Sequence, residues 1–186
     1  MENKRMDTTA LGLIFIALGT LASSLVSFVW YFVESDPYGL VEGDLYFLMG
    51  VCSAFILFAA IGAYLNKSHF GAVFFALISA AFFFSAFTVY GDLYTNISLA
   101  VMLIFLLIWA FAAKKPMMLN MLILTCALTL LFTGVSNAEW LINDQATVWE
   151  LLCGLAKIAT FAISMYLVGS SLKCGLDVFK DGNGEE

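Results

Sequence analysis

Charged residues are scarce in this chain, and histidine is almost absent. Only 12% of the 186 residues are Asp, Glu, Lys or Arg, whereas 62% are hydrophobic. Soluble globular proteins have about 25% charged residues. This composition excludes an ordinary soluble domain, and the formal net charge of -6 argues against a nucleic-acid partner.

Motifs for enzymatic chemistry are also missing. The single histidine, His69, lies close to Lys67 in a short connection between apolar runs. A histidine-based metal site or a histidine-carboxylate pair inside a membrane therefore cannot be assembled. The chain contains no glycine-rich phosphate loop and no Cys-x-x-Cys pair, and its cysteines give no extracellular disulfide framework. We expect no enzyme activity, no metal and no cofactor.

What the chain does contain is a series of long apolar runs, and no internal sequence repeat is evident among them. Each run reaches the roughly 20 residues that a helix needs to cross a bilayer, and lipid excludes isolated strands. The sequence therefore predicts an all-α membrane protein, a bundle of six transmembrane helices that forms one domain over residues 1–186. We expect spans over about 9–33, 45–65, 70–90, 96–113, 117–136 and 149–172, followed by a short cytoplasmic tail, 174–186.

The basic residues predict the orientation of these spans. Lysine and arginine are enriched in the cytoplasmic loops of membrane proteins. Apart from Lys157, which lies inside the last span, all basic residues fall on one side of the predicted membrane. They are Lys4, Arg5, Lys67, Lys114, Lys115, Lys173 and Lys180. Both termini should therefore be cytoplasmic, in a multi-pass protein of the plasma (inner) membrane.

Lys157 is the main candidate for a functional residue. A charge deep in a membrane helix costs about 2.5 to 3.5 kcal/mol and usually faces a partner or a watery cavity. At helical spacings its face carries small and polar residues. These are Glu150, Cys153, Gly154, Thr160, Ser164 and Ser171. Three interpretations remain open: Lys157 reaches outward to the surface, it pairs with Glu150, or it attracts anions beside a conduction path.

Two other spans have stripes of small and hydroxyl residues, which commonly pack helices and can also line a pore. In the first span they are Gly12, Ile16, Gly19, Thr20, Ser23 and Ser27; in the fifth they are Cys126, Thr129, Thr133, Ser136 and Asn137. Together with Lys157 they suggest a shared polar axis. We expect Ser23, Thr129, Thr133, Asn137, Thr160 and Ser164 to line a pore. The third span adds phenylalanines that either form a hydrophobic constriction or pack and face lipid. These are Phe74, Phe75, Phe82, Phe83, Phe84 and Phe87.

The whole chain resembles the acetate uptake transporter family, the succinate-acetate permeases. The resemblance rests on its length, its six spans and three motifs: residues 10–13 (Ala-Leu-Gly-Leu), residues 67–71 (Lys-Ser-His-Phe-Gly) and Ser136-Asn137. The family's Asn-Pro-Ala-Pro-Leu-Gly-Leu signature appears here as Asp-Thr-Thr-Ala-Leu-Gly-Leu over 7–13, without its asparagine and both prolines. The chain is thus similar to a divergent member.

The resemblance implies six-helix protomers that assemble as hexamers, each with its own path for small monocarboxylates. It places a pore constriction at Ile16, Ile78 and Cys126, where familiar members have Phe, Tyr and Leu. Lys157 matches a small residue in those members, so the family does not explain it. We expect a channel or transporter for small monocarboxylate anions such as acetate, with Lys157 attracting the anion. The alternatives are a neutral urea or amide channel and a non-transporting membrane scaffold.

Overall fold

The computed structural model describes residues 8–33, 40–87, 93–136 and 143–174. These form six helices, and the described residues contain no strand. The helices are α1 (Thr8–Val33), α2 (Leu40–Leu65), α3 (His69–Phe87), α4 (Leu93–Ala112), α5 (Met117–Ser136) and α6 (Asn143–Cys174). All six are long and apolar enough to cross a membrane. The prediction of a six-helix membrane bundle is confirmed, and the chain is a multi-pass integral membrane protein.

The predicted spans match these helices apart from their ends. α2 begins at Leu40 rather than near residue 45, and α6 begins at Asn143 rather than near residue 149. Both helices continue past the apolar run, because the backbone hydrogen bonds that define a helix do not stop where the hydrocarbon does. α3 is described as far as Phe87, and the predicted end near residue 90 lies outside the described residues. Of the predicted tail, residues 175–186 lie outside the described part of the chain.

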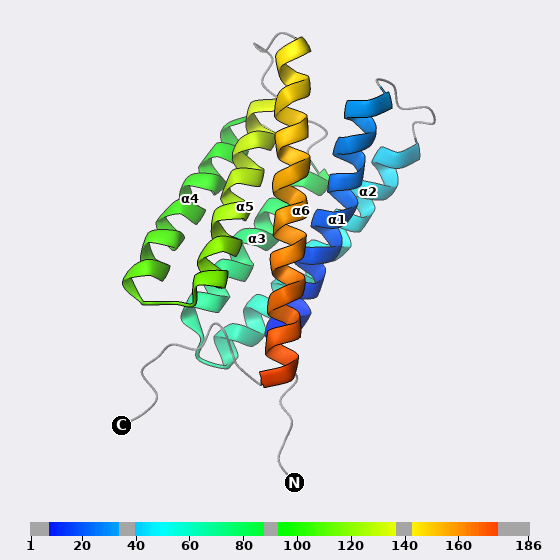
Figure 1. Ribbon diagram of the computed structural model, residues 1–186. Coiled ribbons are helices and arrows are strands. Elements are labelled where there is room, and N and C mark those ends of the chain that lie inside the picture. Colours follow the sequence, from blue (N-terminus) through cyan, green and yellow to red (C-terminus); the bar gives the residue numbers. More distant parts are fainter. Residues whose placement is uncertain (1–7, 34–39, 88–92, 137–142, 175–186) are drawn as a thin grey trace, which may run out of the picture.

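The helices form a bundle in which α6 lies between α1 and α5 (Figure 1). α2 packs against α1 and α3, and α4 packs against α5. α3 and α4 touch each other much less than either touches its hairpin partner. α1 begins and α6 ends at the same end of the bundle, which is the end predicted to face the cytoplasm.

Two hairpins, α2–α3 and α4–α5, close with the same turn. In the first, Lys67 N–H donates to the Tyr64 carbonyl (3.0 Å) and Ser68 N–H to the Ala63 carbonyl (2.9 Å). This pair of bonds is a Schellman motif, and it requires a left-handed residue after the helix, here Lys67 with φ 62°. In the second hairpin Lys114 has φ 51° and Lys115 N–H donates to the Ala110 carbonyl (2.9 Å).

A short sequence repeat accompanies these hairpins. The pattern Val-x-Gly-Asp-Leu-Tyr occurs at residues 41–46, in the first turns of α2, and again at residues 89–94, where α4 begins. Each copy thus leads into the first helix of a hairpin. This short pattern lies at the ends of the apolar runs, among which no internal repeat was expected.

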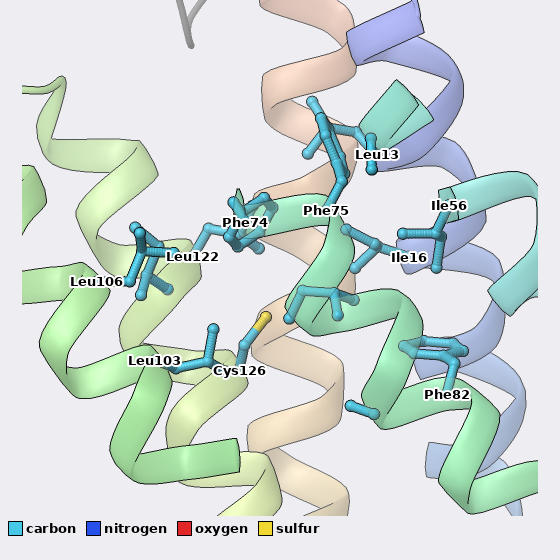
Figure 2. Packing of buried hydrophobic residues seen from close by; sticks show 14 of the residues in the cluster. Leu13, Ile16, Ile56, Phe74, Phe75, Phe82, Leu103, Leu106, Leu122 and Cys126 are labelled. Atoms are coloured by element: carbon cyan, nitrogen blue, oxygen red, sulfur yellow. The ribbon is translucent and has the colours of Figure 1, made fainter. Parts of the chain in front are cut away.

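The glycine stripe of α1 is a packing surface. A Cβ on Gly12 would come within 2.5 Å of the Phe75 ring and 2.7 Å of the Ala59 Cβ, and a Cβ on Gly19 would clash with the Phe82 ring. These close approaches bring α1 against α2 and α3. The rings of Phe74, Phe75 and Phe82 belong to the buried hydrophobic cluster in the middle of the bundle (Figure 2).

A reciprocal pair of serines joins α2 to α3 inside the membrane. Ser53 Oγ donates to the Ser79 carbonyl (2.9 Å), and Ser79 Oγ donates to the Ser53 carbonyl (2.9 Å). The two hydroxyls are 3.2 Å apart, and both side chains are buried. Each hydroxyl is thus satisfied on the neighbouring helix without water, which polar groups in lipid require.

Candidate functional site

The centre of the candidate site is Lys157, whose side chain crosses from α6 to α1. Its ammonium group donates to Ser27 Oγ (2.9 Å) and to the Ser23 carbonyl (3.4 Å). Ser27 Oγ in turn donates to the same Ser23 carbonyl (3.1 Å). Lys157 is partly buried. The cation is therefore held between two helices by a hydroxyl and a backbone carbonyl.

The contacts of Lys157 bear on the two simpler interpretations of its role. Its ammonium group contacts Ser27 and the Ser23 carbonyl on α1. No ion pair within 4.0 Å joins it to a carboxylate among the described residues. Glu150, partly buried on the same face of α6 and about two turns away, is still near enough for the two charges to attract. The charge of Lys157 is thus stabilised mainly by α1.

A close approach of α1 and α6 places Lys157 at this position. Gly154, about one turn from Lys157, has the Phe28 ring packed against it, because a Cβ there would lie 3.2 Å from a ring carbon. Phe28 follows Ser27 directly in α1. The small residue at Gly154 lets the two backbones approach, so the lysine can reach Ser27.

The polar face of α6 also contacts α5, the helix on its other side. Thr133 Oγ1 and Cys153 Sγ are 3.0 Å apart, and Cys153 Sγ lies 3.9 Å from the Thr129 carbonyl oxygen. α6 therefore presents Lys157 to α1 and its small polar residues to α5. Ser23 and Ser27 of α1 and Thr133 of α5 thus contact α6, whereas the glycines of the α1 stripe pack against α2 and α3.

The predicted face of α6 is the buried one. Cys153, Thr160, Ser164 and Ser171 are 3%, 1%, 0% and 2% exposed, whereas Leu155 on the other face is 52% exposed. Ser164 Oγ is fully buried and has no hydrogen-bond partner among the described residues. Asn96 Nδ2 and Asn120 Oδ1 are likewise buried without a partner among the described residues.

Most hydroxyl groups of the predicted lining already bond their own helix. Thr129 Oγ1 donates to the Thr125 carbonyl (2.9 Å), Thr133 Oγ1 to Thr129 (2.8 Å) and Thr160 Oγ1 to Ala156 (2.9 Å). Each of these hydroxyl protons is donated to a backbone carbonyl, but each hydroxyl oxygen can still accept a hydrogen bond. Ser23 Oγ makes a longer bond of 3.4 Å to the Thr20 carbonyl. Asn137 lies outside the described residues.

The three residues of the predicted constriction lie in one buried cluster. Ile16 of α1, Ile78 of α3 and Cys126 of α5 are 0%, 3% and 6% exposed. Figure 2 shows Ile16 and Cys126 among the large apolar side chains that surround them. Aliphatic groups and the Cys126 thiol therefore fill the bundle at this level, with Phe75 beside them.

Several polar groups of the candidate site lie toward one end of the bundle, while Ser164 and Ser171 lie toward the other. Ser23, Ser27, Thr133, Cys153 and Lys157 all lie between the constriction and the end where α1 finishes and α6 begins, which is the predicted outer end. On the other side of the constriction the fully buried large side chains are almost all apolar. They include Leu13, Phe70, Phe74, Leu119 and Leu122.

The phenylalanines of the third span divide into two groups. Phe74, Phe75 and Phe82 are buried, whereas Phe83, Phe84 and Phe87 are 49%, 41% and 68% exposed. The second group faces outward, as lipid-facing aromatics do.

Sequence reasoning placed Ser27 on a polar stripe but did not identify it as the partner of Lys157. Its spacing of four residues from Ser23 was the available signal, because it puts both on one face of α1. The Ser53–Ser79 pair was missed altogether. Each is a single serine in an apolar run, and a helical sequence does not show which helix lies opposite.

The described residues contain no group of three or more His, Cys, Asp or Glu side chains that could hold a metal ion. Comparisons of the chain with protein-family models, curated proteins and solved structures found no match. The geometry around Lys157 therefore carries the functional argument.

Proposed function

We propose that the protein is a channel or transporter that passes small monocarboxylate anions such as acetate across the plasma membrane. The observation that carries this proposal is a partly buried lysine held by Ser27 on a face of small and hydroxyl residues. A cation at this depth is expensive unless it has a partner or a function. Among the described residues, the side chain that its ammonium group contacts within hydrogen-bond distance, Ser27, is neutral, so its charge stays available to an anion.

In the proposed path, a carboxylate enters from the outer end and meets the Lys157 ammonium group. Ser27 supplies a hydroxyl beside it, and Thr133 and Thr160 supply polar groups on the α5 side. The ammonium group replaces part of the hydration that the anion loses. Binding must stay weak, because a tightly held ion is not released.

Beyond Lys157 the anion reaches the apolar level of Ile16, Ile78 and Cys126. This level disfavours hydrated ions and selects small solutes that shed water readily, or the protonated acid. The resemblance to the acetate transporter family supports the same assignment and suggests a hexamer, with one path in each protomer. Lys157 would then be a feature that this chain has added to the family's path.

A non-transporting scaffold is the second candidate. Two observations favour it: the hydroxyls of α5 and α6 bond their own helices, and apolar side chains fill the bundle at the constriction. A neutral urea or amide channel is less favoured, because a partly buried cation gives no advantage to a neutral solute.

Flux through proteoliposomes tests the proposal. Vesicles with the protein should take up labelled acetate faster than empty vesicles, and Lys157→Met should reduce the rate several-fold while the protein stays folded. Lys180→Met, which removes a lysine near the C-terminus, is the matched control and should leave uptake unchanged. Urea, formate, propionate, lactate and succinate then define the substrate class. Equal uptake by protein-containing and empty vesicles for every solute would favour the scaffold.

A further inference from the structure

The two turns at the predicted cytoplasmic end present lysines in a fixed geometry. Lys67 and Lys114 are the left-handed residues of the two Schellman motifs, with φ 62° and 51°. Both side chains are exposed. Glycine is the usual residue at this position, because a side chain adds strain there. Lysine thus occupies both positions despite a conformational cost.

The two turns meet at the first turn of α3. Lys115 Nζ of the α4–α5 turn lies 5.2 Å from the centroid of the Phe70 ring, a cation–π distance. The Phe70 ring also contacts Trp109 of α4 edge to face, with 5.2 Å between centroids. Lys67 lies in the turn that precedes α3, three residues before Phe70. Lys115 therefore reaches the start of the helix that follows Lys67; we name Lys67, Lys114 and Lys115 the basic cluster.

The sequence around the basic cluster is free of acidic residues, because residues 45–91 and 93–138 contain no Asp or Glu. Neither Lys67 nor Lys114 makes an ion pair with any described residue. Positive charges held close together repel each other, so the cluster favours an anion from outside these hairpins.

An apolar strip extends from the basic cluster along α4. Trp109, which touches Phe70, is 46% exposed, and Phe105 and Met102 lie on the same face of α4, one and two turns away. They are 67% and 52% exposed. Because α3 packs only loosely against α4, this strip borders the seam between the two helices.

We propose that the predicted cytoplasmic end of this seam between α3 and α4 is a binding site for an anionic phospholipid. The headgroup phosphate lies among Lys67, Lys114 and Lys115, and one acyl chain follows the strip of Trp109, Phe105 and Met102. A phospholipid is the occupant whose charge and apolar length match both halves of the site. Basic pockets between helices on the cytoplasmic side bind such headgroups in other membrane proteins.

Native mass spectrometry of the detergent-solubilised full chain tests this site. Phosphatidylglycerol should bind about tenfold or more tightly than phosphatidylcholine, since each lysine near a headgroup contributes about 1 kcal/mol. The triple variant Lys67→Gln, Lys114→Gln, Lys115→Gln should lose this preference. The control variant Lys4→Gln, Arg5→Gln, Lys180→Gln removes as many charges from the terminal segments and should keep it.

Two further variants keep the test decisive if the triple variant does not fold. Lys114→Glu changes one exposed charge and should weaken phosphatidylglycerol alone, whereas Phe105→Ser shortens the strip and should weaken both lipids. Equal loss of preference in the triple and control variants would overturn the proposal, because binding would then follow net charge. Equal binding of glycerol phosphate and phosphatidylglycerol would also overturn it, since no acyl chain would be needed. None of these measurements depends on transport.

Discussion

The Lys157 ammonium group lies 2.9 Å from the Ser27 hydroxyl across the α1–α6 interface, and the two residues depend on each other unequally. Ser27 keeps its own bond to the Ser23 carbonyl if the lysine is removed. Lys157, in contrast, would keep only the 3.4 Å contact with that carbonyl if Ser27 were removed. The lysine thus needs the serine more than the serine needs the lysine.

This asymmetry predicts that replacing Ser27 and replacing Lys157 change the free energy of unfolding differently. Ser27→Ala should lower the free energy of unfolding by about 1.5 to 3 kcal/mol, the typical contribution of a hydrogen bond to a charged group. Lys157→Met should be neutral or stabilising, because it removes a partly buried charge and leaves the Ser27 hydroxyl bonded to the Ser23 carbonyl. Unfolding in mixed detergent micelles measures both.

The double variant sharpens this test. Adding Lys157→Met to Ser27→Ala should recover most of the lost stability, since the charge that lacked a partner is gone. Ser24→Ala is the control on the same helix: Ser24 is buried, but it bonds the Leu21 carbonyl and not Lys157. If Ser24→Ala and Ser27→Ala cost the same, the Ser27 hydroxyl does not stabilise the cation.

Reactivity of introduced cysteines should change along the proposed path. In a chain whose native cysteines are replaced, a cysteine at Ser27 should react with a small hydrophilic thiol reagent, because it lies beside the ammonium group at the outer end. A cysteine at Thr160 should react more slowly, and one at Ile16, at the constriction, slowest of all. Rates measured from the outside in oriented vesicles test this order. Absence of reaction at all three positions would favour the scaffold.

The sequence was sufficient for the number and type of helices, because lipid requires long apolar segments to be helical. It was less informative about helix ends: α6 begins at Asn143, where the sequence is polar. It also indicated which face of α6 is buried, since the small polar residues around Lys157 recur at helical spacing. Which helix that face meets depends on tertiary packing, so the contact with Ser27 was not predictable.

The two glycines of α1 illustrate the same limit. Their spacing in the sequence indicated a stripe of small residues, and such stripes occur both in packing surfaces and in pores. In the structure the two parts of the stripe have different contacts. Gly12 and Gly19 pack against phenylalanine rings of α3, while Ser23 and Ser27 contact Lys157. The close fit between Gly19 and Phe82 depends on how α1 packs against α3, so the sequence of either helix does not indicate it.

Gly19→Ala should therefore destabilise the bundle. The added methyl group would overlap the buried Phe82 ring, and overpacking of this kind costs about 1 to 3 kcal/mol, more than the gain in helix propensity. Gly169→Ala in α6 is the matched control, because nothing lies within 4 Å of the new methyl group. Thermal unfolding in detergent should show a lower midpoint for the first variant only. A smaller ring partner, Phe82→Leu, should restore part of the loss.

The Ser53–Ser79 pair should behave as two nearly independent bonds. Each hydroxyl donates to the backbone carbonyl of the other serine, and that carbonyl remains when the side chain is replaced. Ser53→Ala and Ser79→Ala should each cost about 0.6 kcal/mol, the average for such bonds in membranes. Their effects should add, with a coupling energy well below that value, because only the 3.2 Å contact between the hydroxyls is shared. A double-mutant cycle measures the coupling, and a value above about 1 kcal/mol would mean that the hydroxyl–hydroxyl contact dominates.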